Sequence, residues 1–380
     1  MAWTHYQIVL AVVMVATGSI NTLTTAWADR MSAAGSDGVI RKFSHPFVQG
    51  CSMFLGELAC LVVFKIFYVY YRSRNDGSEI ESDIVRGNTH FNPLLFVPPA
   101  VCDMLGTSLM YVGLNLTYPS SFQMLRGAII IFTALLSVAF LEKKIKTHEW
   151  VGIFGVIIGL VTVGYSDYIL IKEKSPADQI SDLNGIITGD MLILMATIIQ
   201  AVQMVYEEKF VVSKDIPPLQ AVGWEGVFGF VILGSLLYPF YYIPVNPPFS
   251  NNAHHVIEDL PDALAQMRNN PLIIYSILGT IVSIAFFNYA GISVTKEMSA
   301  TTRMILDSVR TLFVWIVSLQ LNWQKYHPLQ LLGFALLIFG TAAYNNIRPA
   351  SLYSSLRSSR SEEENDETPI IVTPPDQPTP

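Results

Sequence analysis

Apolar residues along this chain gather in long runs. A membrane-spanning helix needs about 20 predominantly apolar residues. Ten runs reach that length, at residues 5–29, 45–71, 92–115, 118–141, 149–168, 186–207, 220–243, 271–294, 299–321 and 328–346. The pattern therefore predicts an all-α polytopic membrane protein with ten transmembrane helices.

The first run resembles a cleavable signal peptide in its position and its small residues. Residues 1–10, however, contain no Lys or Arg, and the run is long enough to span a bilayer. We expect it to be retained as the first transmembrane helix.

The chain also repeats itself. A shift of 181 residues places Phe132 on Phe313, Ser137 on Ser318, Lys144 on Lys325, Gly152 on Gly333 and Gly159 on Gly340. These matches coincide with the same order of helix, basic loop and glycine-spaced helix at the end of each half. Five spans per half would place the halves in opposite orientations, as in transporters built from inverted repeats. We expect repeats at 1–170 and 186–347, with a connecting lumenal loop at 171–185.

The basic residues in the loops indicate an orientation. Lys and Arg are more numerous in the loops and tail that would be cytosolic if both termini were cytosolic. The longest opposite loop, roughly 244–270, would then face the lumen.

Charged residues interrupt several of the apolar runs. Arg303, Asp307 and Arg310 fall on one face of the ninth predicted helix, because successive residues are about 100° apart. The 181-residue shift places Arg126 opposite Asp307 in the other repeat. Charges at membrane depth are costly unless they face protein or water, so this face should line an internal cavity.

These residues, with polar Gln123 and Asn288, form the candidate solute site. Glu57, Asp103 and Glu225 are candidates for carrying a proton. The alternative is structural: Arg303 and Asp307 at one-turn spacing could neutralise each other, and such pairs could simply hold helices together. If Arg303 and Asp307 pair in this way, Arg310 is the charge without a partner on that helix.

Glycine and proline positions add two expectations. Gly152, Gly155 and Gly159, with Gly333 and Gly340, would allow two helices to approach closely. Pro98 and Pro99 predict a kink in the third span.

Composition narrows the functional classes. The chain is 51% hydrophobic and 14% charged, with a formal net charge of -7 that comes largely from the C-terminal tail and loops. Nothing indicates nucleic-acid binding, a metal site or a cofactor. The chain lacks the zincin and nucleophile-elbow motifs, and an intramembrane aspartyl protease motif is incomplete at Tyr165 and Gly189-Asp190. We therefore expect no enzymatic activity.

Several long strings carry a family resemblance. They include FNPLLFVPPAVCDMLGTSLMYVGLNLT, SSFQMLRGAIIIFTALLSVAFL and AFFNYAGISVTKEMSATTRMILDSVRT. Together with the two halves, they resemble the drug/metabolite transporter superfamily and, within it, subfamily F of solute carrier family 35. The resemblance runs from the N-terminus to about residue 347. It implies ten helices, cytosolic termini and a central cavity that opens alternately to each side, with nucleotide-sugar-like, nucleoside-like or other metabolite substrates.

The last segment, 348–380, is polar, acidic and rich in proline, which predicts a disordered cytosolic tail. Tyr353 and Leu356 match a tyrosine-based sorting signal, and Asp366, Ile370 and Ile371 match an acidic dileucine-like signal. Both resemble signals that clathrin adaptor complexes read. They favour the lysosomal or late-endosomal membrane, with Golgi and mitochondrial membranes as alternatives.

The sequence thus predicts a secondary transporter of a small polar organic solute, driven by protons or by exchange. The lipid bilayer surrounds it, and a homodimer is a further hypothesis. The alternative from another class is a membrane scaffold or regulatory partner that moves no solute.

Overall fold

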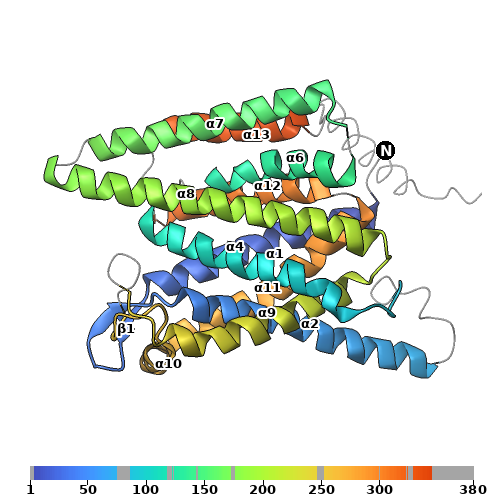
Figure 1. The fold of residues 1–380 in the computed structure, drawn as a ribbon, viewed down its shortest axis with the longest axis horizontal. Helices are drawn as coiled ribbons and strands as arrows, with labels where there is room; N and C mark the ends of the chain where they lie inside the picture. The colour runs from blue at the N-terminus through green and yellow to red at the C-terminus, as the bar shows by residue number, and fades with distance from the viewer. Residues whose placement is uncertain are drawn as a thin grey trace, which may run out of the picture.

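The computed structural model describes residues 4–74, 86–117, 122, 124–142, 144–172, 176–245, 252–298, 300–321, 323 and 328–344. Its main body is a bundle of long helices that lie side by side (Figure 1). They are α1 (His5–Arg30), α2 (Pro46–Arg74), α4 (Val97–Leu116), α6 (Ile129–Leu141), α7 (Thr147–Lys172), α8 (Pro176–Glu207), α9 (Pro218–Phe240), α11 (Pro271–Glu297), α12 (Ala300–Gln320) and α13 (Pro328–Tyr344).

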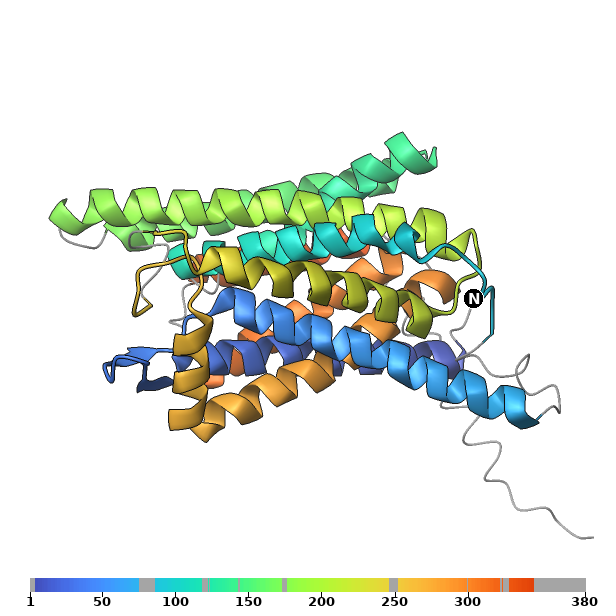
Figure 2. The same cartoon turned by 60° about the horizontal axis from the view of Figure 1, so that its bottom comes forward.

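Shorter elements complete the described chain. A 3-10 turn, η1 (Pro93–Phe96), precedes α4, a second, η2 (Arg126–Ala128), precedes α6, and a π-helical segment, η3 (Glu208–Val212), continues α8. Strands β1 (Ser32–Ala34) and β2 (Ile40–Lys42) form an antiparallel hairpin in which Ala33 pairs with Arg41. The helix α10 (Leu260–Asn269) lies across the ends of the long helices (Figure 2).

Local sequence explains where several helices begin. Thr4 and Gln7 form a reciprocal capping box at the start of α1. The Asn270 side chain caps α11, which then begins at Pro271. Pro98 and Pro99 lie in the first turn of α4, where a proline removes no helical hydrogen bond. The prediction of a kink at these prolines is therefore wrong.

The expected runs correspond closely to the observed helices, with two differences. In the fourth run, 118–141, α6 covers only Ile129–Leu141 and follows the 3-10 turn η2. The second difference is at 171–185. The helix α7 extends to Lys172 and α8 begins at Pro176, so most of that expected loop is helical. Among the described residues, seven helices are long and apolar enough to cross a membrane, and two shorter apolar helices include α13. The prediction of a polytopic all-α membrane protein is confirmed.

Four pairs of helices make the most extensive contacts: α1 with α11, α2 with α9, α4 with α8, and α7 with α13. Glycines bring α7 and α13 together. A Cβ atom on Gly152 would lie 2.4 Å from the backbone nitrogen of Tyr344, and one on Gly340 would lie 2.6 Å from that of Val156. The close packing expected of these glycines is confirmed.

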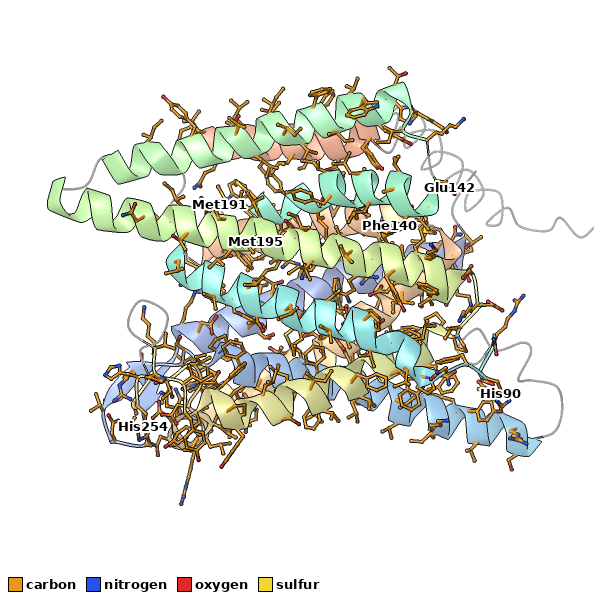
Figure 3. All side chains as sticks on the ribbon, viewed as in Figure 1. His90, Phe140, Glu142, Met191, Met195 and His254 are labelled. Atoms are coloured by element: carbon orange, nitrogen blue, oxygen red, sulfur yellow. The ribbon has the colours of Figure 1, made fainter. Side chains whose placement is uncertain are left out.

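The two ends of the bundle differ. The hairpin and α10 lie at one end, which we call the α10 end, and α1 begins at the other, which we call the N-terminal end (Figure 1). His254 lies at the α10 end and His90 at the N-terminal end (Figure 3).

Candidate functional site

A cavity of about 740 Å³ lies inside the bundle. Residues of α1, α2, α4, α8, α11 and α12 line it, together with Arg126 of η2 and Ile129 at the start of α6. Arg30, Lys42, Ser44 and Trp323 also line it, so the cavity extends to the α10 end. This volume suits a small organic solute.

Most of the predicted site residues meet in this cavity. Its lining includes Arg126, Asn288, Arg303, Asp307 and Arg310, along with Glu57 and Asp103. Glu225 is buried but lies outside the cavity lining. Gln123 and the sorting-signal residues Tyr353, Leu356, Asp366, Ile370 and Ile371 lie outside the described residues.

The three charges of α12 are buried, at 7%, 9% and 4% exposure for Arg303, Asp307 and Arg310. Their pairing differs from the expected one. Nη2 of Arg310 lies 2.7 Å from Oδ1 of Asp307, and Nη2 of Arg126 lies 3.9 Å from Oδ2 of the same carboxylate. Arg310 is therefore not the unpaired charge that simple spacing predicted.

Arg303 instead has a partner on another helix. Its Nη1 donates to Oε2 of Glu207 at 2.7 Å, and Gln203 donates to Oε1 of the same carboxylate at 2.9 Å. Sequence reasoning missed Glu207, because it is the last residue of the apolar run 186–207 and begins the charged string Glu207-Glu208-Lys209. A helix that continues past Glu207 would have placed its side chain inside the bundle, and the structure shows this continuation as η3.

Two further carboxylates face the cavity near Arg303. Oε1 of Glu57 accepts a hydrogen bond from Nδ2 of Asn288, and Oδ1 of Asp103 accepts one from the Thr107 hydroxyl at 3.1 Å. Oε2 of Glu57 is buried and has no hydrogen-bond partner among the described residues. A buried carboxylate oxygen without a hydrogen-bond donor is costly. A ligand that donates a hydrogen bond to this oxygen would remove that cost.

Beyond these groups, toward the N-terminal end, the bundle is closed. The Tyr206 hydroxyl donates to the carbonyl oxygen of Leu95 at 3.1 Å. Nζ of Lys296 lies 2.7 Å from Oδ1 of Asp215. Leu10, Met14, Val294 and Leu306 pack together on the α1 side. The cavity thus reaches one end of the molecule, and ion pairs with apolar packing separate it from the other.

A second charged cluster, which we call the clasp, lies at the α10 end and consists of His45, Glu258 and Asp262. Nδ1 of His45 lies 2.7 Å from Oε1 of Glu258, and its Nε2 lies 3.6 Å from Oδ2 of Asp262. Oε2 of Glu258 accepts from the backbone N–H of Phe47 at 2.9 Å, and Oδ1 of Asp262 accepts from that of Ser36 at 2.7 Å. The clasp joins the hairpin, α2 and α10.

The pKa values in the clasp follow from these contacts. Burial alone would lower the pKa of His45, but its interactions with Asp262 and Glu258 outweigh burial and raise the pKa to about 9. Burial alone would raise the pKa of Asp262, but His45 and the Ser36 donors hold that pKa well below its ordinary value. The imidazolium and the Asp262 carboxylate are therefore both charged at neutral pH.

Comparison with known proteins agrees with the predicted class. Residues 8–219 match the family described as nucleotide-sugar transporter. Solute carrier family 35 member F6 of Homo sapiens is 54% identical over 348 residues, which are 91% of this chain and 91% of that protein. An uncharacterised protein of Schizosaccharomyces pombe is 33% identical over 341 residues, 89% of this chain and 97% of that protein.

One solved protein structure has a related fold. It superposes with a TM-score of 0.52, covers 90% of this chain and 98% of its own, and is 12% identical. At that identity the likeness concerns the fold alone.

Proposed function

The chain belongs to subfamily F of solute carrier family 35, whose members are non-enzymatic membrane transporters, and from that premise we propose that it moves a small polar organic solute across an endolysosomal membrane by alternating access. The observation that carries the proposal is the charged cavity of about 740 Å³, which reaches one end of the bundle and is closed at the other. A transporter in one of its two states has this form.

The helix contacts support two inverted repeats of five helices. If α1, α2, α4, α6 and α7 form one repeat and α8, α9, α11, α12 and α13 the other, exchanging the repeats maps the α1–α11 contact onto the α4–α8 contact. The same exchange maps the α2–α9 and α7–α13 contacts onto themselves. The α1–α12 contact corresponds in the same way to the contact between α8 and α6. A fold with this symmetry can form two states that open to opposite sides.

Alternating access then requires the N-terminal end to open. With cytosolic termini, the described state faces the lumen, and opening to the cytosol must separate Arg303 from Glu207 and Lys296 from Asp215. Glu57, Asp103 and Glu225 are the proposed proton carriers, and the first two of them line the cavity. A change in their charge would alter the balance of charges around Arg303.

The endolysosomal address rests on the tail. We propose that clathrin adaptor complexes read the two signals at Tyr353–Leu356 and Asp366–Ile371. Replacing Ile370 and Ile371 with Ala should move the protein toward the plasma membrane, and more strongly when Tyr353 is also replaced, as seen by surface labelling in cells. If the triple variant still accumulates in lysosomes, the address lies elsewhere in the chain. The homodimer stays a prediction.

Vesicles containing the purified full-length protein provide the test of transport. They are incubated with a mixture of cell metabolites, washed, and analysed by mass spectrometry against protein-free vesicles. Thr107→Trp places an indole in the cavity, whereas Leu105→Trp on the same helix replaces a side chain that is 46% exposed. We expect at least one solute to accumulate with the wild type and Leu105→Trp, and not with Thr107→Trp. If no solute accumulates with the wild type, the scaffold alternative takes its place.

A further inference from the structure

The charges that line the cavity are separated along its length. At the end nearest Arg303 the cavity presents Glu57 and Asp103, and the one cation there is already bound to Glu207. Farther along α12, toward the α10 end, Arg126 and Arg310 share the single carboxylate of Asp307. Asp29, Arg30, Arg41 and Lys42 also line the cavity toward the α10 end, so that part has an excess of positive groups, whereas the part near Arg303 has an excess of negative groups.

From this separation we infer that the transported solute is a zwitterion whose amine binds at Glu57 and Asp103 and whose acidic group binds at Arg126 and Arg310. The inference rests on the proposed transport function and specifies its substrate class. It differs from the substrate in the family's description, because a nucleotide sugar brings no cation to the carboxylates.

The negative end fits an ammonium group. Glu57 is 2% exposed, and its Oε2 has no donor within the described chain. Asn288 and Thr107 supply one neutral donor each to Glu57 and Asp103. An ammonium group carries three N–H donors and a positive charge, which would satisfy the free oxygen and offset the two carboxylates.

The positive end fits a carboxylate or phosphate. Arg310 stacks on Phe287, with 4.7 Å between the guanidinium carbon and the ring centroid, and Arg126 stands 5.8 Å from the Phe122 ring. These contacts restrict where both guanidinium groups lie, and Asp307 contacts Nη2 of each, which leaves further N–H donors on each group for a ligand. Arginine held in this way binds an oxyanion through paired hydrogen bonds.

The spacing along α12 between Arg303, beside the negative end, and Arg310, at the positive end, gives a length scale for the solute. Arg303 and Arg310 are seven residues apart in α12, a rise of about 10 Å at 1.5 Å per residue. An extended chain of three residues spans at most about 10 Å. A tripeptide, or another molecule with an amine and an acid at that separation, fits better than a free amino acid.

Triglycine and its two end-blocked forms are suitable probes. The purified full-length protein in detergent is titrated with triglycine, N-acetyl-triglycine, triglycine amide and a UDP-sugar, and Kd is obtained from the ligand-dependent rise in Tm. We expect triglycine to bind, and each end block to weaken binding on the order of 10- to 100-fold, the effect of losing hydrogen bonds to a charged group. Tighter binding of the UDP-sugar than of triglycine would overturn the inference.

Two variants assign the ends of the molecule. In Glu57→Gln, triglycine and N-acetyl-triglycine should bind alike, because the site no longer favours the free amine. In Arg310→Gln, triglycine and its amide should bind alike. Ser235→Ala, on an exposed part of α9, should reproduce the wild-type order of all four probes. Both blocked forms losing affinity equally in every variant would contradict the assignment.

Transport distinguishes this inference from the function on which it rests. If vesicles accumulate other solutes but neither bind nor take up triglycine, the zwitterion inference fails and the transporter stands. If they accumulate none of the solutes in the metabolite mixture, the transport proposal fails as well.

Discussion

The clasp and the cavity both contain buried charged groups, but they satisfy them to different degrees. In the clasp, both nitrogens of His45 face carboxylates, and Glu258 and Asp262 also accept backbone N–H groups. In the cavity, an oxygen of Glu57 has no donor among the described residues, and Arg126 and Arg310 share one carboxylate. The two regions therefore use buried acidic and basic side chains for different purposes.

Charges that are fully paired hold segments together and gain nothing from a further ligand. Charges that are incompletely paired store an unfavourable free energy that a ligand can relieve. The clasp is accordingly expected to fix the loops of the α10 end, and the cavity to bind. Substitutions can test this contrast by comparing stability with transport.

The largest loss of stability is expected for His45→Ala. The substitution leaves Glu258, which is 1% exposed, without its cation, and leaves Asp262, which is 0% exposed, with Arg41 at 3.7 Å as the cation that remains. Breaking a buried ion pair in this way costs about 3–5 kcal/mol. The Tm of the protein in detergent should fall sharply, while His90→Ala, which replaces an exposed histidine at the N-terminal end, should change it little. Equal effects of the two substitutions would show that the clasp is not a structural centre.

The clasp also predicts a pH dependence. A pKa of His45 raised from 6.5 to about 9 means that its contribution to stability is complete below pH 6.5 and is lost as the pH rises through about 9. The lowered pKa of Asp262 means that its contribution, complete above the ordinary value of 3.8, is lost only in stronger acid. The difference in Tm between the wild type and His45→Ala should be largest below pH 6.5 and shrink as the pH rises from 6.5 to about 9.

Much of the fold could be predicted from the sequence because it depends on local patterns. Runs of apolar residues determine the long helices, and Gly152 and Gly340 determine where α7 and α13 meet. Pro98 and Pro99 were misread because a proline breaks a helix in its interior but suits its first turn, and only the position of η1 shows which applies.

The sequence predicted which residues belong to the site, but not which of them form ion pairs. Helical periodicity places Arg303, Asp307 and Arg310 on one face, whereas the choice of partner depends on which other helix faces them. Glu207 lies 96 residues from Arg303 in the chain, so their contact needs the tertiary structure. Spacing within one helix favoured the Arg303–Asp307 pair, and packing between helices replaced it.

An intermediate effect on stability, and a large one on transport, is expected for Arg310→Gln. Asp307 keeps Arg126 at 3.9 Å, and the glutamine amide can still donate a hydrogen bond, so the loss of stability should be about 1 kcal/mol. Uptake by vesicles, normalised to folded protein, should fall because the positive end loses a charge.

Arg303→Gln serves as the contrast to that variant. It leaves Glu207, which is 2% exposed, without its cation, and should reduce the amount of folded protein. If Arg310→Gln instead transports normally, or loses folded protein as Arg303→Gln does, the α12 charges act in packing and not as a site.

The smallest effect on stability is expected for Glu57→Gln. The amide has nearly the same shape as the carboxylate, keeps an oxygen that can accept from Asn288, and removes a charge that no cation in direct contact offsets. The free energy of unfolding should therefore stay within about 1 kcal/mol of the wild type or rise. Glu258→Gln makes the same chemical change in the clasp, where the carboxylate binds His45 and three backbone N–H groups, and it should lower Tm strongly. Thermal unfolding of the two variants in the same detergent measures the difference directly. If Glu57→Gln lowers Tm as much as Glu258→Gln does, Glu57 is as fully paired as the carboxylates of the clasp. The cavity would then have no incompletely paired carboxylate for a ligand to bind.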